Sequence, residues 1–172
     1  EKTLLAFHHM TLHDTPFRPL IVIPALNAAK TLPPILYNLA SLDTLVVDDG
    51  SEDDTFIVAA AAATVALRHD RNQGHSAAIM SGENYALENG YSHILLVDSD
   101  GQHSPEYAQK AINFLEIHDL VVGDRFGLLE DIPRQKIASN LFASLLIECA
   151  TGCFLRDVSC GFRGYSLYPE LR

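Results

Sequence analysis

Short aliphatic runs recur along the chain, and apolar and polar residues do not alternate within them. Continuous runs of this kind are typical of strands that are buried on both faces, because a strand with one solvated face alternates in polarity. We therefore predict buried strands over four runs and a weaker fifth. The four are Leu20–Ile23, Leu45–Val47, Ile94–Val97 and Leu120–Val122, and the weaker one is Val65–Leu67.

Helical patterns fill the gaps between these runs. They cover residues 30–41, 53–63, 75–89, 105–117 and 134–151, and an extended segment follows over Asp157–Tyr165. Alternation of strands and helices at this spacing predicts an α/β domain with a mainly parallel central sheet and helices on both faces. We expect a single domain over residues 18–172, preceded by a poorly ordered tail over residues 1–17.

One predicted strand runs directly into two carboxylates that are one residue apart. Asp98, Ser99 and Asp100 follow Val97, and Gln102 comes soon after. In parallel sheets, ligands bind beyond the carboxyl ends of the strands. A capped loop is the structural alternative, but carboxylates at this edge suit a hard cation that also binds a diphosphate. Asp98, Asp100 and Gln102 are therefore candidate ligands of Mg²⁺ or Mn²⁺.

Three further groups of polar residues have both a structural and a functional interpretation. The run Asp48–Ser51 either starts and caps a helix or offers a carboxylate to a nucleobase or ribose. The segment Arg71–Ser76 is either an ordinary loop before a helix or a loop whose backbone N–H groups bind an anion. Arg125, Arg134 and Arg163 are either surface ion-pair partners or bidentate phosphate contacts.

Composition and charge exclude several functions. The formal net charge of −10 argues against sequence-independent binding of nucleic acid and against electrostatic attachment to an anionic membrane. The sequence contains no apolar run of 18 residues, the length that crosses a bilayer. Cys149, Cys153 and Cys160 lack a paired framework, which favours reduced thiols and a cytoplasmic location.

Taken in order, these motifs resemble those of the family 2 glycosyltransferases of GT-A fold, and among them the dolichyl- and polyprenyl-phosphate sugar transferases. The resemblance covers about residues 20–168. Single segments are modest signals, but six in family order and at family spacing are specific. The segments are Val22–Asn27, Val46–Ser51, Asn72–Gly74 with Ala77, Ala78 and Gly82, Val97–His103, Gly123–Phe126 and Asp157–Arg163.

The resemblance implies a nucleotide-diphosphate sugar donor, Mg²⁺ or Mn²⁺, and transfer with inversion at the anomeric carbon. It implies that Asp49 contacts the base or ribose and that Asp98 and Asp100 hold the metal and diphosphate. The implied donor-binding residues are Pro24, Leu26, Asn27, Asp48, Asp49, Arg71, Gly74, His75, Asp98 and Ser99; the metal ligands are Asp98, Asp100 and Gln102; and the catalytic residues are Arg125, Arg134, Asp124, Asp157 and Arg163.

Two departures from the family pattern bear on donor affinity and on the choice of nucleotide. Where relatives often read Tyr-Asn-Glu-Glu, this chain reads Leu26–Ala29, which lacks the aromatic residue and both acids. Where relatives often have Gly-Lys-Gly, it has Gly74-His75-Ser76, so an imidazole replaces a phosphate-binding lysine. Relatives often continue beyond the last motif, so we expect further chain, a membrane-bound partner or a second copy to complete the acceptor side.

The acceptor is either a polyprenyl phosphate or a saccharide hydroxyl. A lipid phosphate is already an anion, whereas a hydroxyl needs a general base, for which Asp124 and Asp157 are the candidates. The lack of an obvious base favours the lipid phosphate and a peripheral position at the cytoplasmic membrane face. Two other classes stay open: a non-catalytic domain that binds sugar nucleotides, and a nucleotidyltransferase, although Pro24–Ala29 contains no glycine.

Overall fold

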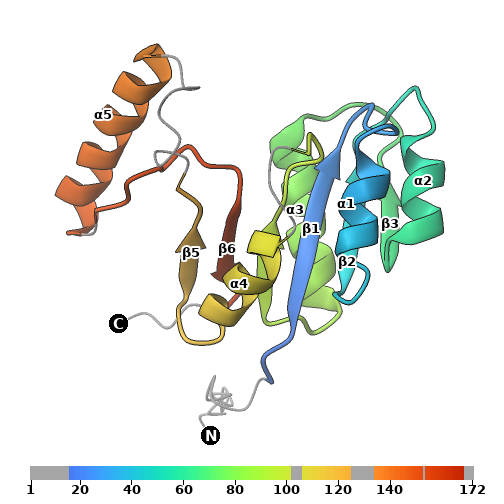
Figure 1. Ribbon diagram of the computed structural model, residues 1–172, viewed down its shortest axis with the longest axis horizontal. Helices are drawn as coiled ribbons and strands as arrows, with labels where there is room; N and C mark the ends of the chain where they lie inside the picture. Colours follow the sequence, from blue (N-terminus) through green and yellow to red (C-terminus); the bar gives the residue numbers. More distant parts are fainter. Residues whose placement is uncertain (1–15, 102–105, 125–133, 153, 169–172) are drawn as a thin grey trace, which may run out of the picture.

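The computed structural model describes residues 16–101, 106–124, 134–152 and 154–168 (Figure 1). Within these residues, six strands form one sheet in the order β3-β2-β1-β4-β6-β5. All strands except β6 point the same way, and β6 lies antiparallel between β4 and β5. The strands are β1 (Pro19–Ala25), β2 (Thr44–Asp48), β3 (Val65–Arg68), β4 (His93–Leu96), β5 (Leu120–Val122) and β6 (Arg163–Ser166).

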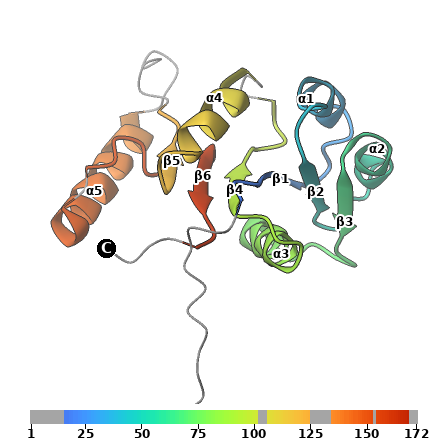
Figure 2. The ribbon, with the colours of Figure 1, turned by 90° about the horizontal axis from the view of Figure 1, so that it is seen from below.

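Helices cover both faces of this sheet, which confirms the predicted fold class. Helices α1, α2 and α4 lie on one face and α3 lies on the other, while α5 lies beyond the β5 edge (Figure 2). The described helices are α1 (Leu32–Asn38), α2 (Thr55–Ala62), α3 (His75–Glu88), α4 (Glu106–Leu115) and α5 (Arg134–Thr151). None of them is long and apolar enough to cross a membrane.

The two-faced burial of the central strands explains their continuous apolar sequences. Along β1, Leu20 and Val22 pack on the α3 side, whereas Ile21 and Ile23 pack on the side of α1, α2 and α4. Helix α3 approaches β1 closely at Gly82, where an added Cβ would overlap the side chain of Val22. The glycine therefore sets the distance between this helix and the sheet.

The prediction of buried strands was wrong for the two edge strands. In β3, Val65, Ala66 and Leu67 are only partly buried, and in β5 the Leu120 side chain is 48% exposed. Both strands lie at the ends of the sheet, so each has one neighbouring strand instead of two. Their residues are apolar, but only the tertiary arrangement places them at an edge.

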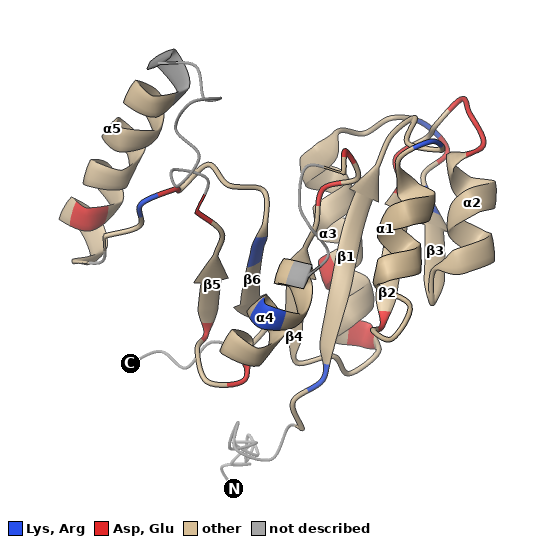
Figure 3. Cartoon of the chain, in the orientation of Figure 1, with Lys and Arg blue, Asp and Glu red and all other residues tan. Residues whose placement is uncertain are grey.

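The strand directions decide where the polar motifs gather. Because β1, β2, β4 and β5 are parallel, the residues that follow them lie along the same edge of the sheet. β6 is antiparallel, so it begins at this edge and brings the segment before Arg163 to it. Acidic residues recur in the loops there (Figure 3). Asp49, Asp98 and Asp124 follow β2, β4 and β5 in the sequence.

Candidate functional site

A cavity of about 400 Å³ opens at the carboxyl edge of the sheet. It brings together predicted donor and metal residues from four separate segments, namely Pro24, Leu26, Asp49, Gly74, His75, Asp98, Ser99 and Asp100. Its lining also includes three residues that we had not assigned to the site: Ala25, Asn72 and Ala78. Asn72 and Ala78 belong to a motif of the family resemblance, so the motif was the signal that could have included them.

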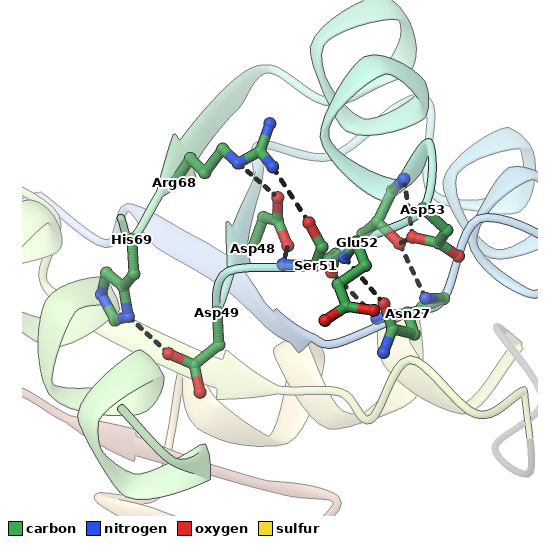
Figure 4. A network of polar contacts seen from close by, with 10 residues as sticks. Asn27, Asp48, Asp49, Ser51, Glu52, Asp53, Arg68 and His69 are labelled. Atoms are coloured by element: carbon green, nitrogen blue, oxygen red, sulfur yellow. Dashed lines mark hydrogen bonds and ion pairs between the residues drawn. The ribbon is translucent and has the colours of Figure 1, made fainter. Parts of the chain in front are cut away.

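Asp49 lies in the wall of this cavity and its carboxylate accepts several hydrogen bonds. The backbone N–H groups of Gln73 and Gly74 donate to it at 2.9 and 2.8 Å, and Nδ1 of His69 lies 2.6 Å from Oδ1 (Figure 4). Burial raises the pKa of Asp49, but these hydrogen bonds outweigh burial, and the pKa lies below the usual value of 3.8. Asp49 is therefore a carboxylate at neutral pH.

Asp48, the neighbouring carboxylate, has a structural environment instead. It is fully buried, its Oδ1 accepts the N–H of Ser51 at 3.0 Å, and its Oδ2 lies 3.3 Å from Nε of Arg68 (Figure 4). Asp48 does not line the cavity. Asp49 therefore faces the cavity while Asp48 makes structural contacts, because successive residues at a strand end point in different directions.

Asn27 joins the loops that follow β1 and β2. Its N–H donates to Oγ of Ser51 at 2.9 Å, and its Oδ1 accepts the N–H of Glu52 at 3.0 Å. Its φ of 51° is in the left-handed region, which asparagine tolerates better than most residues. Neither Asn27 nor the exposed Arg71 lines the cavity. Their assignment as donor contacts stays a prediction, as does that of Asp48.

Gly50 lets the loop after β2 pack against the loop that precedes α3. Its φ is +75°, and a Cβ there would lie 2.5 Å from the carbonyl carbon of Arg71 and 2.6 Å from the backbone nitrogen of Asn72. Any other residue would push these two loops apart. This close approach carries Asn72 and Gly74 to the cavity.

Asp98 and Asp100 place two carboxylates in the cavity wall beside His75. Nε2 of His75 lies 4.0 Å from Oδ1 of Asp98. On the other side, Gly161 fits against Asp98 so closely that an added Cβ would overlap Oδ2. The segment before β6 therefore packs against the Asp98 carboxylate. The resemblance segment Asp157–Arg163 contains Gly161, but it did not indicate this contact.

The donor set at this position fits Mg²⁺ or Mn²⁺. Both prefer oxygen ligands and bind through one or two carboxylates while keeping water and substrate phosphates. No group of three or more His, Cys, Asp or Glu side chains with metal-binding geometry exists among the described residues, and Asp98 and Asp100 are the two carboxylates that would hold the cation. Gln102, the third predicted ligand, lies outside the described residues.

The predicted general bases are both engaged in contacts within the protein. Asp124 lies 3.0 Å from a guanidinium nitrogen of Arg156. Asp157 is 2% exposed, and its carboxylate accepts the hydroxyl of Ser159 at 3.2 Å. Asn140 of α5 holds this segment, because its Nδ2 donates to the carbonyl of Arg156 at 2.8 Å and its Oδ1 accepts the Ser159 N–H at 3.0 Å.

The three predicted arginines are described to different extents. Arg125 lies outside the described residues, and Arg134 begins α5 but its side chain is not described. Arg163 begins β6 beside Leu96 of β4, and its buried Nε has no hydrogen-bond partner among the described residues. Asp124, Asp157 and Arg163 do not line the cavity, so the structure brings together seven of the ten predicted donor residues but not these three catalytic candidates.

Residues 20–168 match the family model of glycosyl transferase family 2, and the chain belongs to this family. It is 36% identical over 159 residues to an uncharacterised protein of Methanocaldococcus jannaschii, covering 83% of this chain and 69% of that protein. It is 31% identical over 160 residues to the undecaprenyl-phosphate mannosyltransferase of Micrococcus luteus, covering 86% of this chain and 66% of that enzyme. The chain thus spans about two thirds of the length of these relatives.

The fold is similar to that of glucosyl-3-phosphoglycerate synthase from Mycobacterium tuberculosis. That structure was solved with Mn²⁺, uridine-diphosphate-glucose and phosphoglyceric acid. The TM-score is 0.65 at 21% identity, and the match covers 88% of this chain and 57% of the synthase. This likeness confirms the predicted GT-A fold.

Proposed function

We propose that this chain is the donor-binding part of an inverting glycosyltransferase that moves a sugar from a nucleoside-diphosphate sugar to a polyprenyl phosphate. The observation that carries the proposal is the single cavity in which Asp49 and the pair Asp98 and Asp100 meet. A carboxylate for the nucleoside and a carboxylate pair for a metal and diphosphate are what such a donor requires. Family membership supports glycosyl transfer over the nucleotidyltransferase alternative.

In the proposed complex, the nucleoside lies against Asp49 and the diphosphate lies between α3 and Asp98. The first residue of α3, His75, is in the cavity wall, and backbone N–H groups at the N-terminus of a helix favour an anion. A bound Mg²⁺ or Mn²⁺, held by Asp98 and Asp100, would stabilise the negative charge that grows on the departing nucleoside diphosphate. His75 can add a positive charge when it is protonated.

The engagement of Asp124 and Asp157 supports a phosphate acceptor over a saccharide hydroxyl. A hydroxyl needs a base that can reach it, but Asp124 is paired with Arg156 and Asp157 is buried. A polyprenyl phosphate carries its own negative charge and needs positioning instead. Arg125, Arg134 and Arg163 are the proposed contacts, and within the described part of the chain the buried Nε of Arg163 has no hydrogen-bond partner.

The curated relative from Micrococcus luteus is named for undecaprenyl phosphate, which supports the same class of acceptor. An acceptor of this kind is held in a membrane, so we propose a peripheral position at the cytoplasmic membrane face. We also propose that the acceptor side is completed by further chain, a membrane-bound partner or a second copy of this chain.

Two measurements test the proposal. Calorimetric titration of UDP and GDP with MnCl₂ tests donor binding, and Asp100→Asn should keep the fold and abolish the metal-dependent part of that binding. Transfer from a radiolabelled sugar nucleotide to polyprenyl phosphate, compared with a saccharide acceptor, tests the reaction. Binding without transfer to either acceptor would favour a non-catalytic domain, and unchanged Mn²⁺-dependent binding by Asp100→Asn would refute the metal assignment.

A further inference from the structure

We propose that His69 is a positioning residue that holds the Asp49 carboxylate in the orientation needed to select the nucleobase. The inference rests on the proposed function, because it concerns the same donor cavity. His69 is not among the residues that line this cavity, and no motif singled it out. Its position directly after β3 was the available signal, since residues that follow parallel strands gather at the ligand-binding edge.

The geometry places His69 between two polar side chains from different elements. Its Nδ1 lies 2.6 Å from Oδ1 of Asp49, and its Nε2 lies 2.9 Å from Oγ of Ser81 in α3. The side chains of His69 and Asp49 are only 11% and 4% exposed. In the neighbouring strands, Asp48 pairs with Arg68, so the residues that follow them lie side by side. The contact is therefore built into the register of the sheet.

Each of the three groups has a definite hydrogen-bonding role. Nδ1–H of His69 donates to the carboxylate, so in the neutral imidazole Nε2 is the acceptor of the Ser81 hydroxyl. The Asp49 carboxylate only accepts, so it fixes the tautomer with the proton on Nδ1, and Ser81 fixes the rotation of the ring. The order Ser-His-Asp is that of hydrolytic triads, but Ser81 does not line the cavity, so it orients the ring and does not act as a nucleophile.

The hydrogen bonds to Asp49 leave one side of the carboxylate for a ligand. Oδ1 accepts His69 and the Gln73 N–H, whereas among the described residues Oδ2 accepts only the Gly74 N–H. A carboxylate has about four acceptor positions, so one remains on Oδ2. Uracil and guanine carry a ring N–H that can donate there, whereas cytosine and adenine present an acceptor nitrogen at the equivalent edge. The orientation of Asp49 therefore affects the choice of base.

Two substitutions at position 69 separate this role from simple packing. In His69→Asn the amide N–H replaces Nδ1–H and can still reach Asp49, whereas in His69→Gln the longer side chain places it near Nε2, toward Ser81. His69→Ala removes the contacts with both Asp49 and Ser81, whereas Ser81→Ala removes only the contact between Ser81 and the imidazole ring. His118→Ala is a control for loss of an exposed histidine away from the cavity.

The experiment is calorimetric titration of each variant with UDP, GDP, CDP and ADP in MnCl₂, beside melting curves. We expect His69→Ala and His69→Gln to bind the preferred nucleotide roughly 10- to 100-fold more weakly, the size of a charge-assisted hydrogen bond, and to bind CDP and ADP about as before. His69→Asn should keep most of the preference for the preferred nucleotide over CDP and ADP. In Ser81→Ala this preference should fall roughly two- to fivefold.

Several results would overturn the inference. Equal weakening for all four nucleotides in His69→Gln would indicate a structural role, and so would identical behaviour of His69→Asn and His69→Gln. A wild-type protein that binds UDP and GDP no better than CDP and ADP would remove the selectivity that His69 is proposed to support. Absence of binding to all four nucleotides would refute the proposed function itself, so the two failures are distinguishable.

Discussion

Two regions of this molecule are held together in different ways. In the first region, residues 19–100, the strands β1, β2 and β4 are buried on both faces and the loops at their ends are tied by hydrogen bonds. In the second region, residues 120–168, helix α5 exposes apolar side chains and the segment after it is held by polar contacts of Asn140 and Arg156. The exposed residues of α5 include Leu141, Phe142, Leu145 and Leu146.

The comparison separates two ways of building a site. The cavity residues of the first region are fixed by the same core that stabilises the fold, so the cavity is preorganised before a ligand arrives. The second region contributes a few well-placed residues, such as Arg163 and Gly161, to the edge of that core. We therefore expect changes in the core of the first region to cost much stability, and changes to exposed side chains of the second region to cost little.

The same substitution in the two regions should have very different costs. Leu95→Ala removes a fully buried side chain from the central strand β4 and should cost about 2–5 kcal/mol of the free energy of unfolding. Leu146→Ala changes a side chain of α5 that is 55% exposed and should stay within about 0.5 kcal/mol. Urea unfolding of both variants measures this, and equal costs would mean that α5 is packed as tightly as the central sheet.

Substitution of the arginines of the second region should slow transfer strongly while changing stability little. Each contact to phosphate strengthens as negative charge grows, so Arg125→Ala and Arg134→Ala should slow transfer roughly 100- to 1000-fold, or about 2.7–4 kcal/mol. The melting temperature should change little, because neither residue lies in an apolar run. Lysine at either position should rescue only partly, since it cannot make a planar bidentate contact.

Initial rates with a radiolabelled sugar nucleotide and polyprenyl phosphate, beside melting curves, test this prediction. Full activity in both alanine variants would refute the role of the arginines. Unfolding of both would mean that they are structural ion-pair partners.

Gly161 is the point where the second region touches the first, and its substitution should affect both stability and binding. In Gly161→Ala the new methyl group overlaps the Asp98 carboxylate, and overpacking of this kind costs about 1–3 kcal/mol. Displacement of Asp98 should also remove Mn²⁺-dependent binding of the nucleotide. Gly152→Ala is the matched control, since its φ of +72° strains the backbone while no atom lies within 4 Å of the added Cβ. Normal binding by Gly161→Ala would refute the role of this contact.

The smallest effect concerns the acid stability of the first region. The folded pKa of Asp49 lies below the ordinary value of 3.8, so its contribution is fully present above that pH and is lost as the pH falls through the folded pKa. Asp49→Asn should cost about 1 kcal/mol at pH 7, and the difference from the wild type should shrink below pH 3.8. Unfolding measured from pH 7 to pH 2 tests this, and a constant difference would contradict it.

Local sequence patterns were sufficient to predict the strands and helices and the edge of the sheet at which the cavity lies. The aliphatic runs predicted β1 to β5, the helical patterns lie where α1 to α5 are found, and the rule for parallel sheets predicted that Asp49 and Asp98 meet at one edge. These features depend on side-chain polarity and on a chain direction that strand–helix alternation imposes, so they can be derived from neighbouring residues alone.

Tertiary structure decided what depends on residues that are distant in sequence. Three features depend on strand order and register: the insertion of β6 between β4 and β5, the different roles of Asp48 and Asp49, and the contact of Asp49 with His69, which in turn contacts Ser81. The fit of Gly161 against Asp98 joins residues 63 positions apart by steric contact alone. The sequence thus determined which elements form and which side chains can do chemistry, whereas packing decided which of those side chains face the ligand and which hold the others in place.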